Sequence, residues 1–194
     1  WEDVVSTIYE GDNFGKQLTR RNFFKDDLAG VLDGASGYMD KMNRVYAFVK
    51  DHMNWNKRYG FSSASGLAKA YREKTGNTGD INLMLTAMLK ESGLNANPVL
   101  LSTRSRGKPV FPTLDGFNYV IAAVEIDGKR YLLDATEKMA APNVLPSRVL
   151  NWKGTMVMEN GSSLEVDLYP KQISQESNRL NRLPKSHIVT QQTS

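Results

Sequence analysis

The chain has 194 residues, a formal net charge of +4 and no cysteine. This length fits one domain with extensions, and the missing cysteines exclude a disulfide scaffold, a thiolate metal site and a cysteine nucleophile. The basic residues are scattered and no nucleic-acid-binding motif is present, so we expect no nucleic-acid partner. No apolar run approaches the roughly 18 residues that cross a bilayer, so we expect no membrane insertion. Because the chain begins at Trp1 rather than at a methionine, we interpret it as a piece of a longer protein.

Residues 1–36 are predicted to form an N-terminal helical extension. Apolar residues stand at helical spacing at positions 1, 4, 5 and 8, and a turn cluster follows. The same spacing at positions 42, 45, 46 and 49 predicts a longer helix over residues 38–53. A third helix is expected over residues 65–74, with Ser62, Ser63 or Ser65 as its cap.

The strongest helical pattern lies over residues 76–93. Apolar positions 81, 84, 85 and 88 follow helical spacing, and further apolar residues leave little polar face, so the sequence predicts a central buried helix. Asn77 or Thr78 is placed to cap this helix, with Asp80 in its first turn and Gly93 at its end. The free N–H groups of a helix N-terminus stabilise negative charge, so a nucleophile would belong at position 78.

The second half of the chain has the pattern of an antiparallel sheet. Strands are expected over residues 98–102, 117–126 and 129–133, and two more within residues 149–168. Asp127 and Gly128 form a predicted two-residue hairpin turn. The sequence therefore predicts an α+β fold in which a central buried helix packs on an antiparallel β-sheet.

The predicted hairpin also fixes a register. If Asp127 and Gly128 are the only turn residues, directly paired residues have numbers that sum to 255. Tyr119 and Asp134 are then diagonal neighbours on one face of the sheet. Thr78 would join them if the central helix packs across that face.

Four separated motifs resemble the transglutaminase-like superfamily, whose fold is related to papain-type cysteine proteases. They are Gly76-Asn77-Thr78-Gly79-Asp80, Gly93-Leu94-Asn95-Ala96-Asn97-Pro98-Val99, Phe117-Asn118-Tyr119-Val120-Ile121 and Tyr131-Leu132-Leu133-Asp134-Ala135-Thr136. The resemblance covers about residues 38–140, and the motifs occur in the family's order.

The resemblance implies a division of the chain. It places a transglutaminase-like core at residues 37–140, a β-strand extension of that core at 141–170, and a polar tail or linker at 171–194. The flanks are similar to those of multidomain bacterial envelope proteins. This similarity implies a periplasmic or secreted parent protein with flanking domains.

Carried onto this sequence, the family's cysteine falls on Thr78, its histidine on Tyr119 and its aspartate on Asp134. The family's triad works through a thiolate that the helix N-terminus and an imidazole base activate, while the carboxylate orients the imidazole. A threonine hydroxyl stays protonated near neutral pH, and a phenol with an ordinary pKa of about 10 is a poor base. The resemblance therefore implies a pseudoenzyme with no catalytic residue.

Each of these three residues also has a simpler structural interpretation. Thr78 is more readily a helix cap than a nucleophile, Tyr119 a core or cleft-lining aromatic, and Asp134 a strand-end carboxylate that the Tyr119 hydroxyl satisfies. If a cleft remains, its candidate binding residues are Trp55, Asn77, Thr78, Arg104, Arg106, Asn118, Tyr119 and Asp134. Trp55 is explained more simply by packing, whereas the loop of Arg104 and Arg106 is the best candidate for contacting an anionic partner.

Three hypotheses for function follow from these patterns. The first is a non-catalytic binding or scaffold module of a larger cell-envelope protein, with peptide or peptidoglycan-like fragments as candidate ligands and no cofactor or metal. The alternative is an active hydrolase or acyltransferase with Thr78 as nucleophile, which needs a base, and the only histidines are His52 and His187. The third is a structural spacer in which the Tyr119 and Trp55 rings fill the former site.

Overall fold

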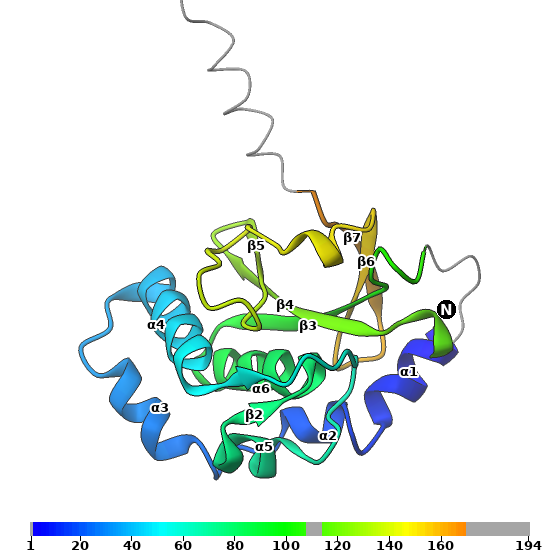
Figure 1. Ribbon diagram of the computed structural model, residues 1–194. Coiled ribbons are helices and arrows are strands. Elements are labelled where there is room, and N and C mark those ends of the chain that lie inside the picture. The colour runs from blue at the N-terminus through cyan, green and yellow to red at the C-terminus, as the bar shows by residue number, and fades with distance from the viewer. Residues whose placement is uncertain (1, 108–113, 170–194) are drawn as a thin grey trace, which may run out of the picture.

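The computed structural model describes residues 2–107 and 114–169. Helices dominate its first half and strands its second half (Figure 1). The elements in chain order are α1 (Glu2–Glu10), α2 (Gly15–Leu18), α3 (Lys25–Leu32), α4 (Gly37–His52), β1 (Asn54–Trp55), α5 (Leu67–Glu73), β2 (Thr75–Gly76), α6 (Thr78–Glu91), β3 (Asn95–Leu101), η1 (Leu114–Gly116), β4 (Tyr119–Ile126), β5 (Lys129–Leu133), η2 (Ser147–Val149), β6 (Lys153–Val157) and β7 (Ser163–Asp167).

Helix α6 is the centre of the domain, as its apolar pattern predicts. Every residue from Thr78 to Leu89 is buried. The helix contacts β3 and β4 on one side and α2, α4 and α5 on the others, so it lies between the sheet and the remaining helices (Figure 1). A helix that is apolar around its whole circumference is stable only in such a position, because every face must leave water.

Asn77 is the N-cap of α6. Its Oδ1 accepts a hydrogen bond from the Asp80 N–H at 2.7 Å, and the Asp80 Oδ2 accepts one from the Asn77 N–H at 3.0 Å. This reciprocal pair is a capping box, which satisfies two of the backbone donors that the helix start leaves free. The interpretation of Thr78 as the cap is therefore wrong, because Thr78 is the first residue inside the helix.

The predicted serine cap of α5 is also wrong. Gly66 occupies the N-cap position of α5, and the N–H of Leu67 donates to the side-chain Oε1 of Gln17 at 3.1 Å. The Ser63 hydroxyl instead joins the starts of the two helices, because it donates to the Asp80 Oδ1 at 2.6 Å and accepts from the Gly66 N–H at 2.9 Å.

The five-stranded sheet has the order β5-β4-β3-β6-β7, and every neighbouring pair is antiparallel. The β4–β5 hairpin pairs Ile126 with Lys129 and Ala122 with Leu133, which confirms the predicted register. Both turn residues, Asp127 and Gly128, have positive φ, as a two-residue turn of type I′ requires. Strands β6 and β7 continue the same sheet beyond β3.

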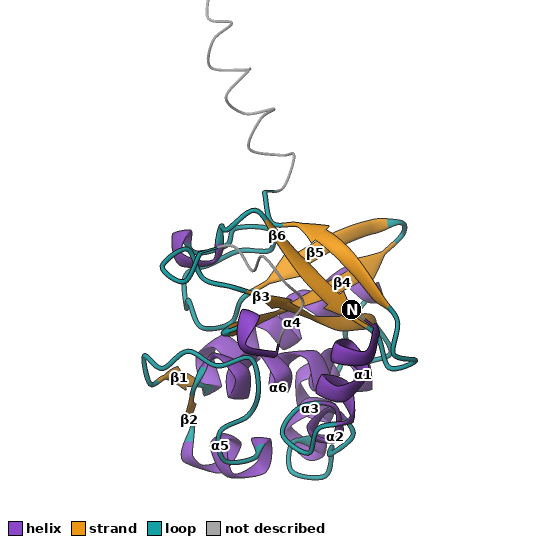
Figure 2. Cartoon of the chain, turned by 90° about the vertical axis from the view of Figure 1, so that its right-hand side faces the viewer, coloured by secondary structure: helices purple, strands orange, loops and turns teal. Residues whose placement is uncertain are grey.

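The two faces of β4 pack against different neighbours. Val120, Ala122 and Val124 belong to the large core that contains α6, whereas Tyr119 and Ile121 belong to a smaller cluster on the opposite face. Helix α6 therefore packs on the face opposite to Tyr119. The prediction that Thr78 joins Tyr119 and Asp134 required α6 to pack on the Tyr119 face, so this requirement is not met. Figure 2 shows most of the helices gathered on one side of the sheet.

The N-terminal helices take part in the main core. Val5, Phe14, Leu18 and Phe24 are buried in the same cluster as α6. No helix within residues 2–107 and 114–169 is long and apolar enough to span a bilayer. The predicted polar tail, residues 171–194, lies outside the described residues.

We predict that Leu85→Ala lowers the free energy of unfolding by about 2 to 5 kcal/mol, because it leaves a cavity at the centre of α6. Leu85 has no exposed surface. Chemical denaturation measures the change, and Met139→Ala is the control, since 96% of Met139 is exposed. A loss below about 1 kcal/mol for Leu85→Ala would contradict the central place of this helix.

Candidate functional site

The start of α6 is held by a loop that we call the strap, residues 56–64. The strap follows β1, which pairs in parallel with β2 just before α6. The Asn77 Nδ2 donates to the Ser62 carbonyl at 3.2 Å, and the Ala64 N–H donates to the Asp80 Oδ1 at 3.1 Å. The backbone of the strap thus lies directly on the helix N-terminus.

Thr78, the predicted counterpart of the family's cysteine, is hydrogen-bonded to the strap through its hydroxyl. Its hydroxyl donates to the Gly60 carbonyl at 2.7 Å and accepts from the Gly60 N–H at 2.9 Å. The side chain has no exposed surface. A Cβ on the neighbouring Gly79 would lie 2.1 Å from the Ser62 carbonyl oxygen, so only glycine allows this close approach. Thr78 shares no hydrogen bond with the described side chains of Tyr119 and Asp134.

Tyr119 and Asp134 do come together, as the predicted register indicates. The Tyr119 hydroxyl donates to the Asp134 Oδ2 at 2.7 Å, and both residues are completely buried. Burial, and next the nearby Asp134 carboxylate, raise the pKa of the Tyr119 phenol well above its ordinary value of 10. The phenol therefore stays protonated near neutral pH and donates a hydrogen bond instead of accepting a proton.

The second oxygen of Asp134 is equally well satisfied. Its Oδ1 accepts from the Asn82 Nδ2 at 2.9 Å, from the Thr136 N–H at 3.0 Å and from the Thr136 hydroxyl at 2.7 Å. The Tyr46 hydroxyl donates to the backbone carbonyl of the same residue at 3.1 Å. A buried carboxylate needs such a complete set of donors, and here it has them.

Asn82 is a residue of the site that the sequence analysis does not identify. From the middle of α6 its Nδ2 donates to the Val120 carbonyl as well as to Asp134, and its Oδ1 accepts from the Ala135 N–H, each at 2.9 Å. One amide therefore joins the helix to β4 and to the end of β5. The available signal was a polar residue within the apolar stretch of a buried helix.

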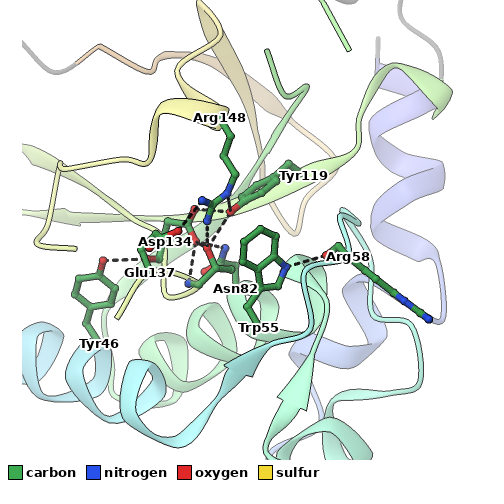
Figure 3. A network of polar contacts seen from close by, with 9 residues as sticks. Tyr46, Trp55, Arg58, Asn82, Tyr119, Asp134, Glu137 and Arg148 are labelled. Atoms are coloured by element: carbon green, nitrogen blue, oxygen red, sulfur yellow. Dashed lines mark hydrogen bonds and ion pairs between the residues drawn. The ribbon is translucent and has the colours of Figure 1, made fainter. Parts of the chain in front are cut away.

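Arg148 is the second missed residue, and it comes from η2. Its Nη2 donates to the Thr136 hydroxyl at 2.8 Å and its Nη1 pairs with the Glu137 carboxylate at 2.6 Å. The guanidinium lies 4.4 Å from the centre of the Trp55 ring (Figure 3). Nothing in the sequence pattern singles out this arginine, because it meets the site only through the fold.

The other candidate residues have separate roles. The Asn118 side chain accepts from the Thr103 N–H and donates to the Thr103 hydroxyl, both at 2.8 Å, so it shapes the turn that carries Arg104 and Arg106. Both arginines are exposed. Trp55 is half-buried, and its indole N–H donates to the Arg58 carbonyl at 3.0 Å.

The histidine that could serve as a base is engaged elsewhere. The His52 ring stacks on Tyr71 with a centroid distance of 4.1 Å, and its Nε2 lies 3.0 Å from the Tyr71 carbonyl. His187 lies outside the described residues. Within the described part of the chain, no cluster of histidine and acidic side chains is placed to hold a metal ion.

Comparison of the sequence with known protein families shows the family to which this chain belongs. The region with the central helix α6 and the strands β3, β4 and β5 matches the transglutaminase-like superfamily over residues 26–134. This match spans more than half of the 194 residues. The chain therefore belongs to the transglutaminase-like superfamily.

A solved structure has the same fold. It is a crystal structure of a protein from Parabacteroides distasonis that is described as a proposed protease, with a TM-score of 0.58 and 14% sequence identity. The similarity covers 87% of this chain and 31% of that one, so the chain spans less than a third of the similar protein. At this identity the likeness shows the fold alone. No curated protein matches the chain.

We predict that Asn82→Ala lowers the free energy of unfolding by about 3 kcal/mol or more, because it leaves the Val120 carbonyl and the Ala135 N–H buried without partners. Thermal and chemical unfolding measure this change. The control is Asn22→Ala at an exposed position, for which a change within about 0.5 kcal/mol is expected. Equal effects of the two substitutions would show that Asn82 does not join helix and sheet.

Proposed function

We propose that this chain is a non-catalytic transglutaminase-like domain that serves as a scaffold and binding module within a larger protein. The observation that carries the proposal is that the Thr78 hydroxyl is buried and fully hydrogen-bonded. It lies at the family's nucleophile position, has no exposed surface, and is hydrogen-bonded to both the carbonyl and the N–H of Gly60. A hydroxyl held in this way has a structural role.

The chemistry of the site supports the same proposal. A hydroxyl nucleophile needs a base that removes its proton, and the raised pKa of Tyr119 makes the phenol unsuitable. The Tyr119 hydroxyl also donates its hydrogen bond to Asp134 and shares no hydrogen bond with Thr78, so this pair is not placed to accept the Thr78 proton. Loss of a triad member costs on the order of 10⁴ to 10⁶ in rate, which leaves no useful activity.

The alternative of an active hydrolase or acyltransferase has less support. It needs an imidazole beside Thr78, whereas His52 is stacked on Phe48 and Tyr71. The spacer hypothesis shares with the proposal the lack of catalysis. It is supported by the Arg148 guanidinium and the Trp55 ring, which pack together beside Tyr119 (Figure 3). We infer a scaffold whose contacts with partners are made on its surface.

The setting of the domain is also a proposal. The similar protein of Parabacteroides distasonis extends well beyond the part that this chain covers, which supports a role within a larger protein. We propose a periplasmic or secreted parent, with peptide or cell-wall fragments as candidate ligands, on the basis of the family resemblance of the flanks. Fractionation of cells that express the parent protein tests the location.

We predict that the purified chain neither deamidates nor cross-links a glutamine-containing peptide in the presence of a primary amine. It should likewise leave peptidoglycan fragments intact. Ammonia release and mass spectrometry measure both reactions, and the expected rate equals that of Thr78→Ala. Turnover that disappears in Thr78→Ala but persists in Thr19→Ala, at an exposed threonine, would overturn the proposal.

A further inference from the structure

A group of cations without carboxylate partners lies on two segments that flank the candidate site. They come from two segments, the strap after β1 and the turn after β3. All four side chains are exposed, and none forms an ion pair with the described acidic residues: Lys57, Arg58, Arg104 and Arg106. Arg44 and Arg130 are paired with carboxylates. Lys25 and Lys69, by contrast, are exposed and, like these four, form no ion pair with the described acidic residues, so it is the position of the four beside two aromatic rings that distinguishes them.

Arg148 connects these two segments. The Arg104 N–H donates to the Arg148 carbonyl at 2.9 Å, and the Arg148 guanidinium lies 4.4 Å from the Trp55 ring centre. Arg148 therefore lies between the turn, which its backbone contacts, and Trp55, the residue that precedes the strap. Glu137, the carboxylate that contacts Arg148, is already neutralised by that arginine at 2.6 Å.

Two aromatic rings in this region are held rigidly. Trp55 and Tyr59 stack at a centroid distance of 5.8 Å and an interplanar angle of 18°, and the Lys57 ammonium lies 4.5 Å from the Trp55 ring centre. The indole N–H is fixed on the Arg58 carbonyl. Tyr59 is 43% exposed, and the Arg58 side chain points outward from the polar network (Figure 3).

We propose that this basic aromatic surface, formed by Trp55, Lys57, Arg58, Tyr59, Arg104 and Arg106, docks an acidic polypeptide segment of a partner protein. Tryptophan, tyrosine and arginine are the residues that dominate binding energy at protein interfaces. Arginine pairs with carboxylates through two parallel hydrogen bonds, and rigid rings lose little entropy on binding. The cations stand on two short loops, whereas single-stranded nucleic acid is bound along a continuous basic groove.

This inference goes beyond the proposed function and rests on one part of it, the role as a binding module. The two can fail separately. Binding of an acidic segment does not involve the Thr78 hydroxyl, and the turnover assay does not depend on these surface cations.

The experiment is a fluorescence anisotropy titration of dye-labelled oligoglutamate with the 194-residue chain. Binding is expected, and it should weaken as salt rises because the contacts are charge pairs. Arg104→Glu with Arg106→Glu, and separately Lys57→Glu with Arg58→Glu, should each weaken binding by about tenfold or more. The matched control is Lys25→Glu with Lys69→Glu, which changes the net charge equally on α3 and α5 and should alter binding by less than about twofold.

Three results would overturn the proposal. They are no binding of oligoglutamate, equal weakening by the control and the surface variants, and tighter binding of oligothymidylate than of oligoglutamate at this surface. Thermal unfolding of each variant shows whether it is folded, and a charge-reversal variant that is not folded is replaced by the one with glutamine at the same two positions.

Discussion

The buried carboxylate of Asp134 is the constraint on which the centre of this domain depends. A carboxylate without exposed surface is stable only when its oxygens are hydrogen-bonded. Its donors come from α6 through Asn82, from β4 through Tyr119, and from the chain after β5 through Thr136. One side chain thus joins the central helix to β4 and to the segment that follows β5.

The start of α6 is fixed by a second polar arrangement of the same kind. The capping box, the Thr78 hydroxyl and the strap satisfy one another, so the helix N-terminus is covered by Gly60 and Ser62. Under the proposed function, Thr78, Tyr119 and Asp134, onto which the family resemblance carries the triad, hold the helix, the sheet and the strap together. Contacts with other molecules are then expected on the surface, where the unpaired cations lie.

Much of this arrangement could be predicted from sequence because it is local. The apolar circumference of α6 indicates its burial, and the two-residue turn at Asp127 and Gly128 sets the register that brings Tyr119 to Asp134. The face of the sheet that receives α6 could not be predicted, because β4 is apolar on both faces. The roles of Thr78 and Arg148 also escaped prediction, since their partners come from the strap and from segments that only the fold brings near.

The most direct measurement is a double-mutant cycle on the free energy of unfolding with Tyr119→Phe and Asp134→Asn. Tyr119→Phe removes only the hydroxyl, and Asp134→Asn keeps the shape of its partner. If the Tyr119 hydroxyl is hydrogen-bonded to the buried Asp134 carboxylate, the two substitutions should show a coupling free energy of about 1 to 3 kcal/mol. A coupling below about 0.3 kcal/mol, within the error for independent sites, would contradict a network built around Asp134.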